Sequence, residues 1–232
     1  MSCCAPCSCG TIAELKNMVS SRKICGTQIC AGPGQDRMAE NVSDNEYSDA
    51  PSGHRVPHNF ASRNFRDDIF ISDFIVLFFN PNIHPESEYQ KRLAEQIRLC
   101  ESLGVKYAVG NYDHETWLRA VSGLEGEPER GARCAACFRH RFAFGAEWAR
   151  ENGYNAIASV FGVSRHKDQA QVDAAANEFA DVIAYLPIDW DESLRDEINT
   201  RLRRGPGGQE KSDFYRQKYC GCEFSKRPGT VL

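Results

Sequence analysis

Short apolar runs alternate with segments of helical periodicity through the middle and later parts of the chain. Four apolar runs have the length of a buried strand: Phe74–Phe79, Val105–Val109, Asn155–Val160 and Ile183–Leu186. Between and around them, apolar residues recur at helical spacing in four segments: 86–103, 116–122, 138–152 and 169–180. This alternation is typical of a parallel sheet with helices on both faces.

We therefore predict an α/β fold with Rossmann-like layering, similar to that of adenine-nucleotide hydrolases, and a cysteine-rich cluster site at the carboxyl ends of the strands. Before this region, residues 11–18 have helical spacing, and a Thr followed three residues later by a Glu predicts a capping box. Residues 31–68 are rich in Gly, Pro, Asn, Asp and Ser and have little apolar periodicity. We predict a single domain over residues 1–232, with an irregular insertion at about residues 22–70.

Charge and hydropathy limit the possible settings. The net charge of −4 gives no overall signature of nucleic-acid binding, although residues 201–232 carry eight basic and three acidic side chains. That surplus could contact phosphates or belong to a solvated tail. No segment has the roughly 20 apolar residues of a membrane span, and the start lacks the basic and apolar parts of a secretory signal. We expect a cytoplasmic, reducing setting. In such a setting cysteines act as metal ligands or redox groups more often than they form structural disulfides.

Eleven cysteines are present, and most of them fall in three clusters. These are Cys-Cys-Ala-Pro-Cys-Ser-Cys at 3–9, Cys-Ala-Ala-Cys at 134–137 and Cys-Gly-Cys at 220–222. A Cys-x-x-Cys pair can direct two thiolates at one metal centre, and the first cluster could supply the other two ligands. Adjacent cysteines seldom both bind one small tetrahedral ion, so this spacing favours an iron–sulfur cluster over zinc. Zinc and a metal-free thiol–disulfide site remain alternatives.

The Cys-Gly-Cys segment indicates a different chemistry. One intervening glycine makes a small, strained disulfide feasible, and such disulfides are the labile, catalytic ones. The basic neighbours Lys218, Lys226 and Arg227 should favour thiolate character. We predict a redox pair, with two unreacted thiols or two further metal ligands as the alternatives.

Several longer motifs surround these cysteines in a fixed order. They are Cys-Cys-Ala-Pro-Cys-Ser at 3–8, Phe-Phe-Asn-Pro-Asn-Ile-His-Pro at 78–85, Asn-Tyr-Asp at 111–113, Gly-Leu-Glu-Gly-Glu-Pro-Glu at 123–129, Arg-Cys-Ala-Ala-Cys-Phe at 133–138, Ser-Arg-His-Lys-Asp at 164–168 and Phe-Tyr-Arg-Gln-Lys-Tyr-Cys-Gly-Cys at 214–222. In these motifs the sequence resembles the epoxyqueuosine reductases of the QueH type.

The resemblance implies an oxidoreductase that reduces epoxyqueuosine to queuosine in tRNA, the last step in making this wobble-position nucleoside. It implies a [4Fe-4S] cluster whose ligands match four cysteines: Cys3, Cys4, Cys134 and Cys137. Cys220 and Cys222 match the redox-active disulfide. Family members have also been described with a separate mononuclear iron beside the cluster, for which Cys7 is a candidate ligand. The implied partners are tRNA carrying epoxyqueuosine at the anticodon wobble position and an unidentified electron donor, with no membrane.

Opening an epoxide to an alkene takes two electrons and two protons, so an acid must protonate the leaving oxygen. Three candidates follow predicted strands: His84, Asp113 and His166. Each could instead cap a loop or support a neighbour. Candidate phosphate contacts are Arg139, Arg141, Arg165 and Lys167, and candidate platforms for unstacked bases are Tyr89, Trp117 and Tyr215. Core packing is the alternative for each aromatic residue.

Two other functions remain open from the sequence. A zinc-stabilised, non-enzymatic binding module would use the same cysteines as structural ligands. A cluster-dependent tRNA thiolase could share the α/β scaffold, but the sequence lacks the glycine-rich loop that cradles phosphates in such enzymes.

Overall fold

The computed structural model describes Ile12 and residues 73–161, 167–187, 215 and 217–225. Six of the eleven cysteines therefore lie outside the described residues: Cys3, Cys4, Cys7, Cys9, Cys25 and Cys30. The predicted insertion at about 22–70 also lies outside them. Of the helix predicted over residues 11–18, only Ile12 is described, and it is helical and buried.

The described strands form two parallel pairs. Strand β1 (Val76–Phe78) pairs with β2 (Tyr107–Val109), and β3 (Ala156–Ala158) pairs with β4 (Ala184–Leu186). All four predicted strands are present, each shortened to three residues. The α/β class and the parallel pairing are confirmed. One continuous sheet is not seen, because among the described residues the hydrogen bonds define two separate two-stranded sheets.

Four α-helices and a short 3-10 helix accompany these strands in the described part of the chain. They are α2 (Glu86–Leu103), α3 (His114–Ala120), α4 (Ala132–Glu151), α5 (Gln169–Asn177) and η2 (Glu223–Ser225). Helix α2 has the predicted bounds and ends at Gly104, whose φ of 60° gives the left-handed C-cap that glycine adopts readily. Helix α4 begins at Ala132 rather than at the predicted residue 138, so the Cys-x-x-Cys motif is part of the helix.

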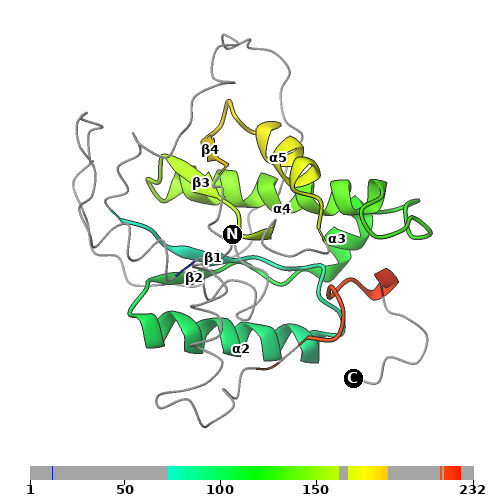
Figure 1. Cartoon of the computed structure of the whole chain (residues 1–232), viewed down its shortest axis with the longest axis horizontal. Helices are drawn as coiled ribbons and strands as arrows, with labels where there is room; N and C mark the ends of the chain where they lie inside the picture. The colour runs from blue at the N-terminus through cyan, green and yellow to red at the C-terminus, as the bar shows by residue number, and fades with distance from the viewer. Residues whose placement is uncertain (1–11, 13–72, 162–166, 188–214, 216, 226–232) are drawn as a thin grey trace.

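Helix α2 packs against the first strand pair through a small apolar cluster. Val76 of β1, Leu99 and Cys100 of α2, Val105 and Ile12 are its buried members. Cys100 is fully buried and behaves as a small core residue, as its position on the predicted helix indicated. Figure 1 shows α2 along one side of β1 and β2, and α4 along the other side.

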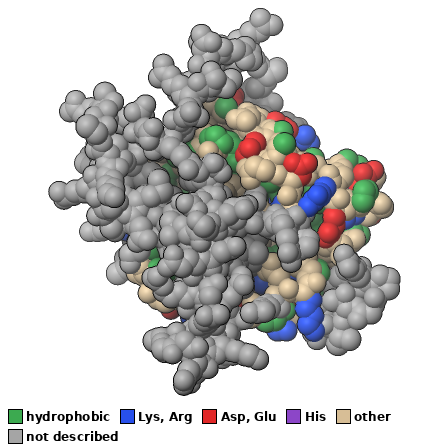
Figure 2. Space-filling model, in the orientation of Figure 1, with side chains coloured by type: hydrophobic (Ala, Val, Ile, Leu, Met, Phe, Trp, Pro, Cys, Tyr) green, Lys and Arg blue, Asp and Glu red, His purple; other side chains and the backbone are tan. Residues whose placement is uncertain are grey.

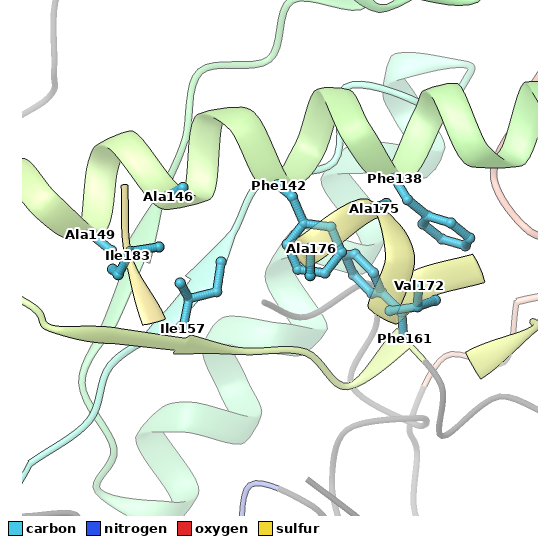
Figure 3. Close-up of a cluster of buried hydrophobic side chains, with 10 residues drawn as sticks. All are labelled: Phe138, Phe142, Ala146, Ala149, Ile157, Phe161, Val172, Ala175, Ala176 and Ile183. Carbon is cyan, nitrogen blue, oxygen red and sulfur yellow. The ribbon is translucent and has the colours of Figure 1, made fainter. Parts of the chain in front are cut away.

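The largest buried cluster lies between α4, α5 and the second strand pair. Phe138 and Phe142 of α4 point toward Phe161, with ring centroids 5.7 and 5.8 Å from it (Figure 3). Val172 and Ala176 of α5 complete this contact. Full burial of a phenylalanine contributes about 1.5–3 kcal/mol. This cluster therefore fixes the position of α4, the helix that carries Cys134 and Cys137.

Within the described residues, no helix is long and apolar enough to cross a membrane. On the described part of the face seen in Figure 2, acidic and basic side chains are intermixed.

Candidate functional site

The Cys-x-x-Cys motif lies in the first two turns of α4. Cys134 and Cys137 are three residues apart in the helix, so their side chains lie on the same face. The Arg130 backbone N–H donates to Cys134 Sγ across 3.3 Å. Arg130 has a φ of 69°, which non-glycine residues seldom adopt. The turn before α4 thus directs a backbone donor at the first sulfur of the motif.

Gly221 sits between Cys220 and Cys222 in a conformation that few other residues could adopt. Its φ is 110°, and a Cβ there would lie 2.9 Å from Ile83 Cγ1 and 3.0 Å from Arg92 Nη1. The Gly221 carbonyl accepts a 2.9 Å hydrogen bond from the His84 N–H. The glycine of the Cys-Gly-Cys segment is therefore required by both dihedral angle and space.

A buried guanidinium holds the backbone of this segment. Arg92 of α2 donates 3.0 Å hydrogen bonds to the carbonyls of Tyr219 and Cys220, and a 2.8 Å one to Glu88 Oε1. Arg92 and Glu88 are 1% and 2% exposed, and Tyr215 Oη donates to the other Glu88 oxygen across 2.5 Å. A buried ion pair with these extra hydrogen bonds fixes geometry more than it adds stability. The guanidinium thus holds the backbone at Cys220, which is 128 positions away in sequence.

The two cysteine segments line one small hollow of about 20 Å³. Its lining comes from α4, the Cys-Gly-Cys segment and residues that follow three of the strands: Asn82, Trp117, Arg133, Cys134, Cys137, Phe138, Lys167, Cys220 and Cys222. Asn82 follows β1, Trp117 follows β2 and Lys167 follows β3. The structure therefore brings together four of the six cysteines that the sequence analysis assigns to a cluster or a redox pair. All four are free thiols in the structure.

Burial governs the protonation of two of these thiols. It raises the pKa of the Cys134 thiol, which the hydrogen bond from Arg130 only partly offsets. It raises the pKa of Cys222 to about 12. The expected thiolate character is therefore wrong for Cys222, because desolvation outweighs the nearby Arg133 charge. Lys167 Nζ lies 3.5 Å from Cys220 Sγ, which places one ammonium beside the outer cysteine of the segment.

Three buried polar atoms of the hollow's lining residues lack a hydrogen-bond partner among the described residues. They are Asn82 Oδ1, Trp117 Nε1 and Arg133 Nε. Trp117 is fully buried and Arg133 is 2% exposed, so water does not compensate them freely. Buried donors in folded proteins are as a rule paired with protein, ordered water, an ion or a ligand. Two of the three, the indole and guanidinium N–H groups, can only donate, so they fit a ligand with acceptor atoms.

Asp113 caps a helix. Its carboxylate accepts a 2.9 Å hydrogen bond from the Thr116 N–H at the start of α3, and a second bond from the Thr116 hydroxyl. These bonds lower the pKa of Asp113, which keeps it ionised and makes it a poor proton donor. Asp113 is exposed and does not line the hollow. The geometry favours the capping role over the predicted catalytic one. His166, another candidate acid, lies outside the described residues.

Most candidate RNA contacts have structural roles. Arg139 pairs with Glu178 on the surface, and Arg141 is buried over the ring of Phe161. Tyr89 and Trp117 are buried, so neither offers a free face to a base. For these two aromatic residues the packing alternative is correct. Lys167 lines the hollow, and Arg165 lies outside the described residues.

The sequence analysis missed the residues that position the cysteines. Arg92 and Glu88 lie four residues apart on the buried face of α2, in a helix predicted only from its apolar positions. Charged residues on the apolar face of a predicted helix were the available signal, since such residues are seldom buried unless paired. His114 and Glu223 were also missed. They directly follow Asp113 and Cys222, and a 2.8 Å contact joins them.

The fold and the site together define a class of protein: a parallel α/β protein with a multi-cysteine site. The comparison with known families is more specific. The model of the family "Epoxyqueuosine reductase QueH" matches residues 60–228. The chain therefore belongs to the epoxyqueuosine reductase QueH family, and the resemblance drawn from its motifs is confirmed.

Individual relatives agree with this assignment. The chain is 39% identical over 165 residues to the epoxyqueuosine reductase QueH of Histophilus somni. It is 38% identical over 159 residues to the proteins of the same name from Haemophilus influenzae and Acinetobacter baylyi. Each match covers 67% of this chain, but the first two span only 63% and 62% of the relatives' lengths.

Proposed function

We propose that this chain reduces epoxyqueuosine to queuosine in tRNA. Its family membership supports this function, because the relatives carry the name epoxyqueuosine reductase. The observation that carries the proposal is the hollow in which Cys134 and Cys137 meet Cys220 and Cys222. Two electrons and two protons must reach one epoxide, and groups that supply them need a shared site.

We assign Cys3, Cys4, Cys134 and Cys137 as ligands of a [4Fe-4S] cluster, which would supply electrons one at a time. Cys134 and Cys137 fit an iron–sulfur cluster, because their thiols lie on one face of α4 and a backbone N–H donates to the Cys134 sulfur. The raised pKa of Cys134 also fits, since coordination deprotonates a thiol that burial alone would keep neutral. Cys7 is our candidate ligand for an additional mononuclear iron.

We assign Cys220 and Cys222 as a redox-active pair that cycles between dithiol and disulfide. Oxidation to the disulfide releases two electrons and two protons, which is what converting an epoxide to an alkene and water consumes. Cys222, with its pKa raised to about 12, would hold its proton until it reacts. Lys167 contacts the Cys220 sulfur, and the unpaired N–H groups of Trp117 and Arg133 could bind an oxygen acceptor in the hollow.

The finer architecture also belongs to this proposal. We infer a Rossmann-like layering in which both strand pairs contribute to one ligand-binding edge. Asn82, Trp117 and Lys167 support it, because each follows a strand and each lines the hollow. In parallel α/β proteins, ligands bind at the carboxyl ends of strands. The substrate would be tRNA with epoxyqueuosine at the wobble position, in the cytoplasm, and the electron donor is a separate, unidentified component.

Nucleoside analysis of tRNA tests the activity. A strain lacking this protein should accumulate epoxyqueuosine, and expression of the chain should restore queuosine. The Cys222→Ser variant should not restore it, because a hydroxyl cannot form the disulfide. Cys100→Ala removes a buried thiol in a different cluster, and should restore queuosine like the unaltered chain. If Cys222→Ser restores queuosine, the redox pair is wrong.

The cofactor is tested separately from the activity. Protein purified without oxygen should be brown, with charge-transfer absorption that is lost in Cys134→Ala and kept in Cys100→Ala. A colourless protein that holds stoichiometric zinc and unfolds with chelators would support the binding-module alternative. Turnover that depends on ATP would support the thiolase alternative.

A further inference from the structure

Two imidazoles and a carboxylate meet beside Trp117, a residue that also lines the cysteine hollow. His84 follows β1, His114 begins α3 and Glu223 begins η2. One ligand atom from each residue lies within 4.8 Å of the other two. The imidazole rings stack with centroids 4.8 Å apart, and His114 also stacks on Trp117 at 5.3 Å. Three segments that are distant in sequence thus present three potential metal ligands at one point.

The contacts of the His114 ring determine which of its two nitrogens carries the hydrogen and which has the lone pair. Its Nδ1 lies 2.7 Å from the Pro81 carbonyl oxygen, which can only accept, so Nδ1 carries the hydrogen. Its Nε2 lies 2.8 Å from Glu223 Oε1. A neutral imidazole would then direct a lone pair at a carboxylate oxygen. A positive charge must therefore lie between them, either a proton on Nε2 or a metal ion.

Two features favour the metal ion. A metal-binding histidine commonly donates its other N–H to a backbone carbonyl, which fixes the ring, and His114 does so to Pro81. A proton would bridge only His114 and Glu223, leaving the His84 ring nitrogen without a role at the same point. A metal ion uses all three donors. The exposed fractions of His114 and Glu223, 14% and 30%, leave room for entry from solvent.

We propose that His84, His114 and Glu223 bind a divalent transition-metal ion, of the Zn²⁺ or Fe²⁺ class. Imidazole and carboxylate ligands suit these ions. Three protein ligands leave a further position for water. None of these three residues lines the cysteine hollow, so the two sites use different side chains. The ion would fasten Glu223, the residue after Cys222, to α3 and to the loop after β1.

Cobalt binding tests this site without any measurement of turnover. Co²⁺ is added to the full chain, and the spectrum of Glu223→Gln is subtracted from that of the unaltered chain. Glu223→Gln keeps the shape of the side chain, and its amide can donate to His114 Nε2. We expect the variant to lose one bound ion. The difference spectrum should show visible ligand-field bands and no sulfur-to-cobalt charge transfer, because the ligands are nitrogen and oxygen.

A second ligand variant and a matched control keep the test decisive. His114→Gln should lose the same ion, whereas Glu115→Gln, one position along α3 and exposed, should lose none. Zn²⁺ should raise the thermal midpoint of the unaltered chain and of Glu115→Gln, but not of the two ligand variants. Equal Co²⁺ binding and equal Zn²⁺ stabilisation in all four proteins would overturn the proposal and assign a proton to the His114–Glu223 contact. A sulfur charge-transfer band in the difference spectrum would also overturn it.

Discussion

The substitution Gly221→Ala tests the strongest geometric constraint in the cysteine site. The φ of 110° lies where residues other than glycine are strained by about 1–3 kcal/mol. The new Cβ would also lie 2.9 Å from Ile83 Cγ1 and 3.0 Å from Arg92 Nη1. Ile83 and Arg92 are each 1% exposed, and three hydrogen bonds anchor the guanidinium, so neither can move aside freely. Overpacking of this kind costs about 1–3 kcal/mol.

The two effects together predict a loss of roughly 2–6 kcal/mol in the free energy of unfolding. With an m-value of about 2–3 kcal/mol per M, the urea midpoint should fall by roughly 0.7–3 M. Urea unfolding followed by tryptophan fluorescence measures this directly. The loss is comparable to the whole stability of many proteins, so unfolding should be recorded at low temperature as well.

Two other glycines separate the contributions of dihedral strain and crowding. Gly153 has a φ of 77° and no atom within 4 Å of a built Cβ, so Gly153→Ala should lose about 1–2 kcal/mol from strain alone. Gly126 lies in open space outside the left-handed region, and Gly126→Ala should change the stability by less than about 0.5 kcal/mol. If Gly221→Ala is no less stable than Gly153→Ala, the inferred crowding against Arg92 is wrong.

Two further predictions concern charged side chains. Asp113→Ala should lower the free energy of unfolding by about 0.5–2 kcal/mol, since it removes the cap of α3. Because folding lowers the pKa of Asp113 from its ordinary 3.8, this contribution is present above that value and disappears as the pH falls through the folded pKa. Urea midpoints of the two proteins should therefore converge in acid, and a constant difference would contradict the capping role. Arg92→Met should lose about 3–5 kcal/mol, because it leaves the Glu88 carboxylate buried and unpaired. Arg139→Met, which breaks an exposed pair with Glu178, should lose less than about 1 kcal/mol, and equal losses would refute the buried clamp.

The predicted helix bounds were confirmed where residues in the sequence itself mark the helix ends. Helix α2 has its predicted bounds because Pro85 and Gly104 mark its two ends in the sequence itself. The strands were predicted in the right places but too long, since apolar residues such as Phe79 continue into the core after the ladder ends. Helix α4 begins earlier than predicted because its first turns carry cysteines and an arginine rather than an apolar periodicity.

By itself the sequence determined the α/β class, the order of its elements and which cysteines belong to motifs, because periodicity and motif spacing are local properties. Only the tertiary structure decided that the Cys-x-x-Cys and Cys-Gly-Cys segments share one hollow, since α4 and the C-terminal segment are far apart along the chain. It also reversed the electrostatic expectation at Cys222: neighbouring lysines and arginines are visible in a sequence, but the burial that raises the pKa of this thiol is not. The contacts of Arg92 with Cys220 and of His114 with Glu223 were hidden for the same reason, because each joins residues that only folding brings together.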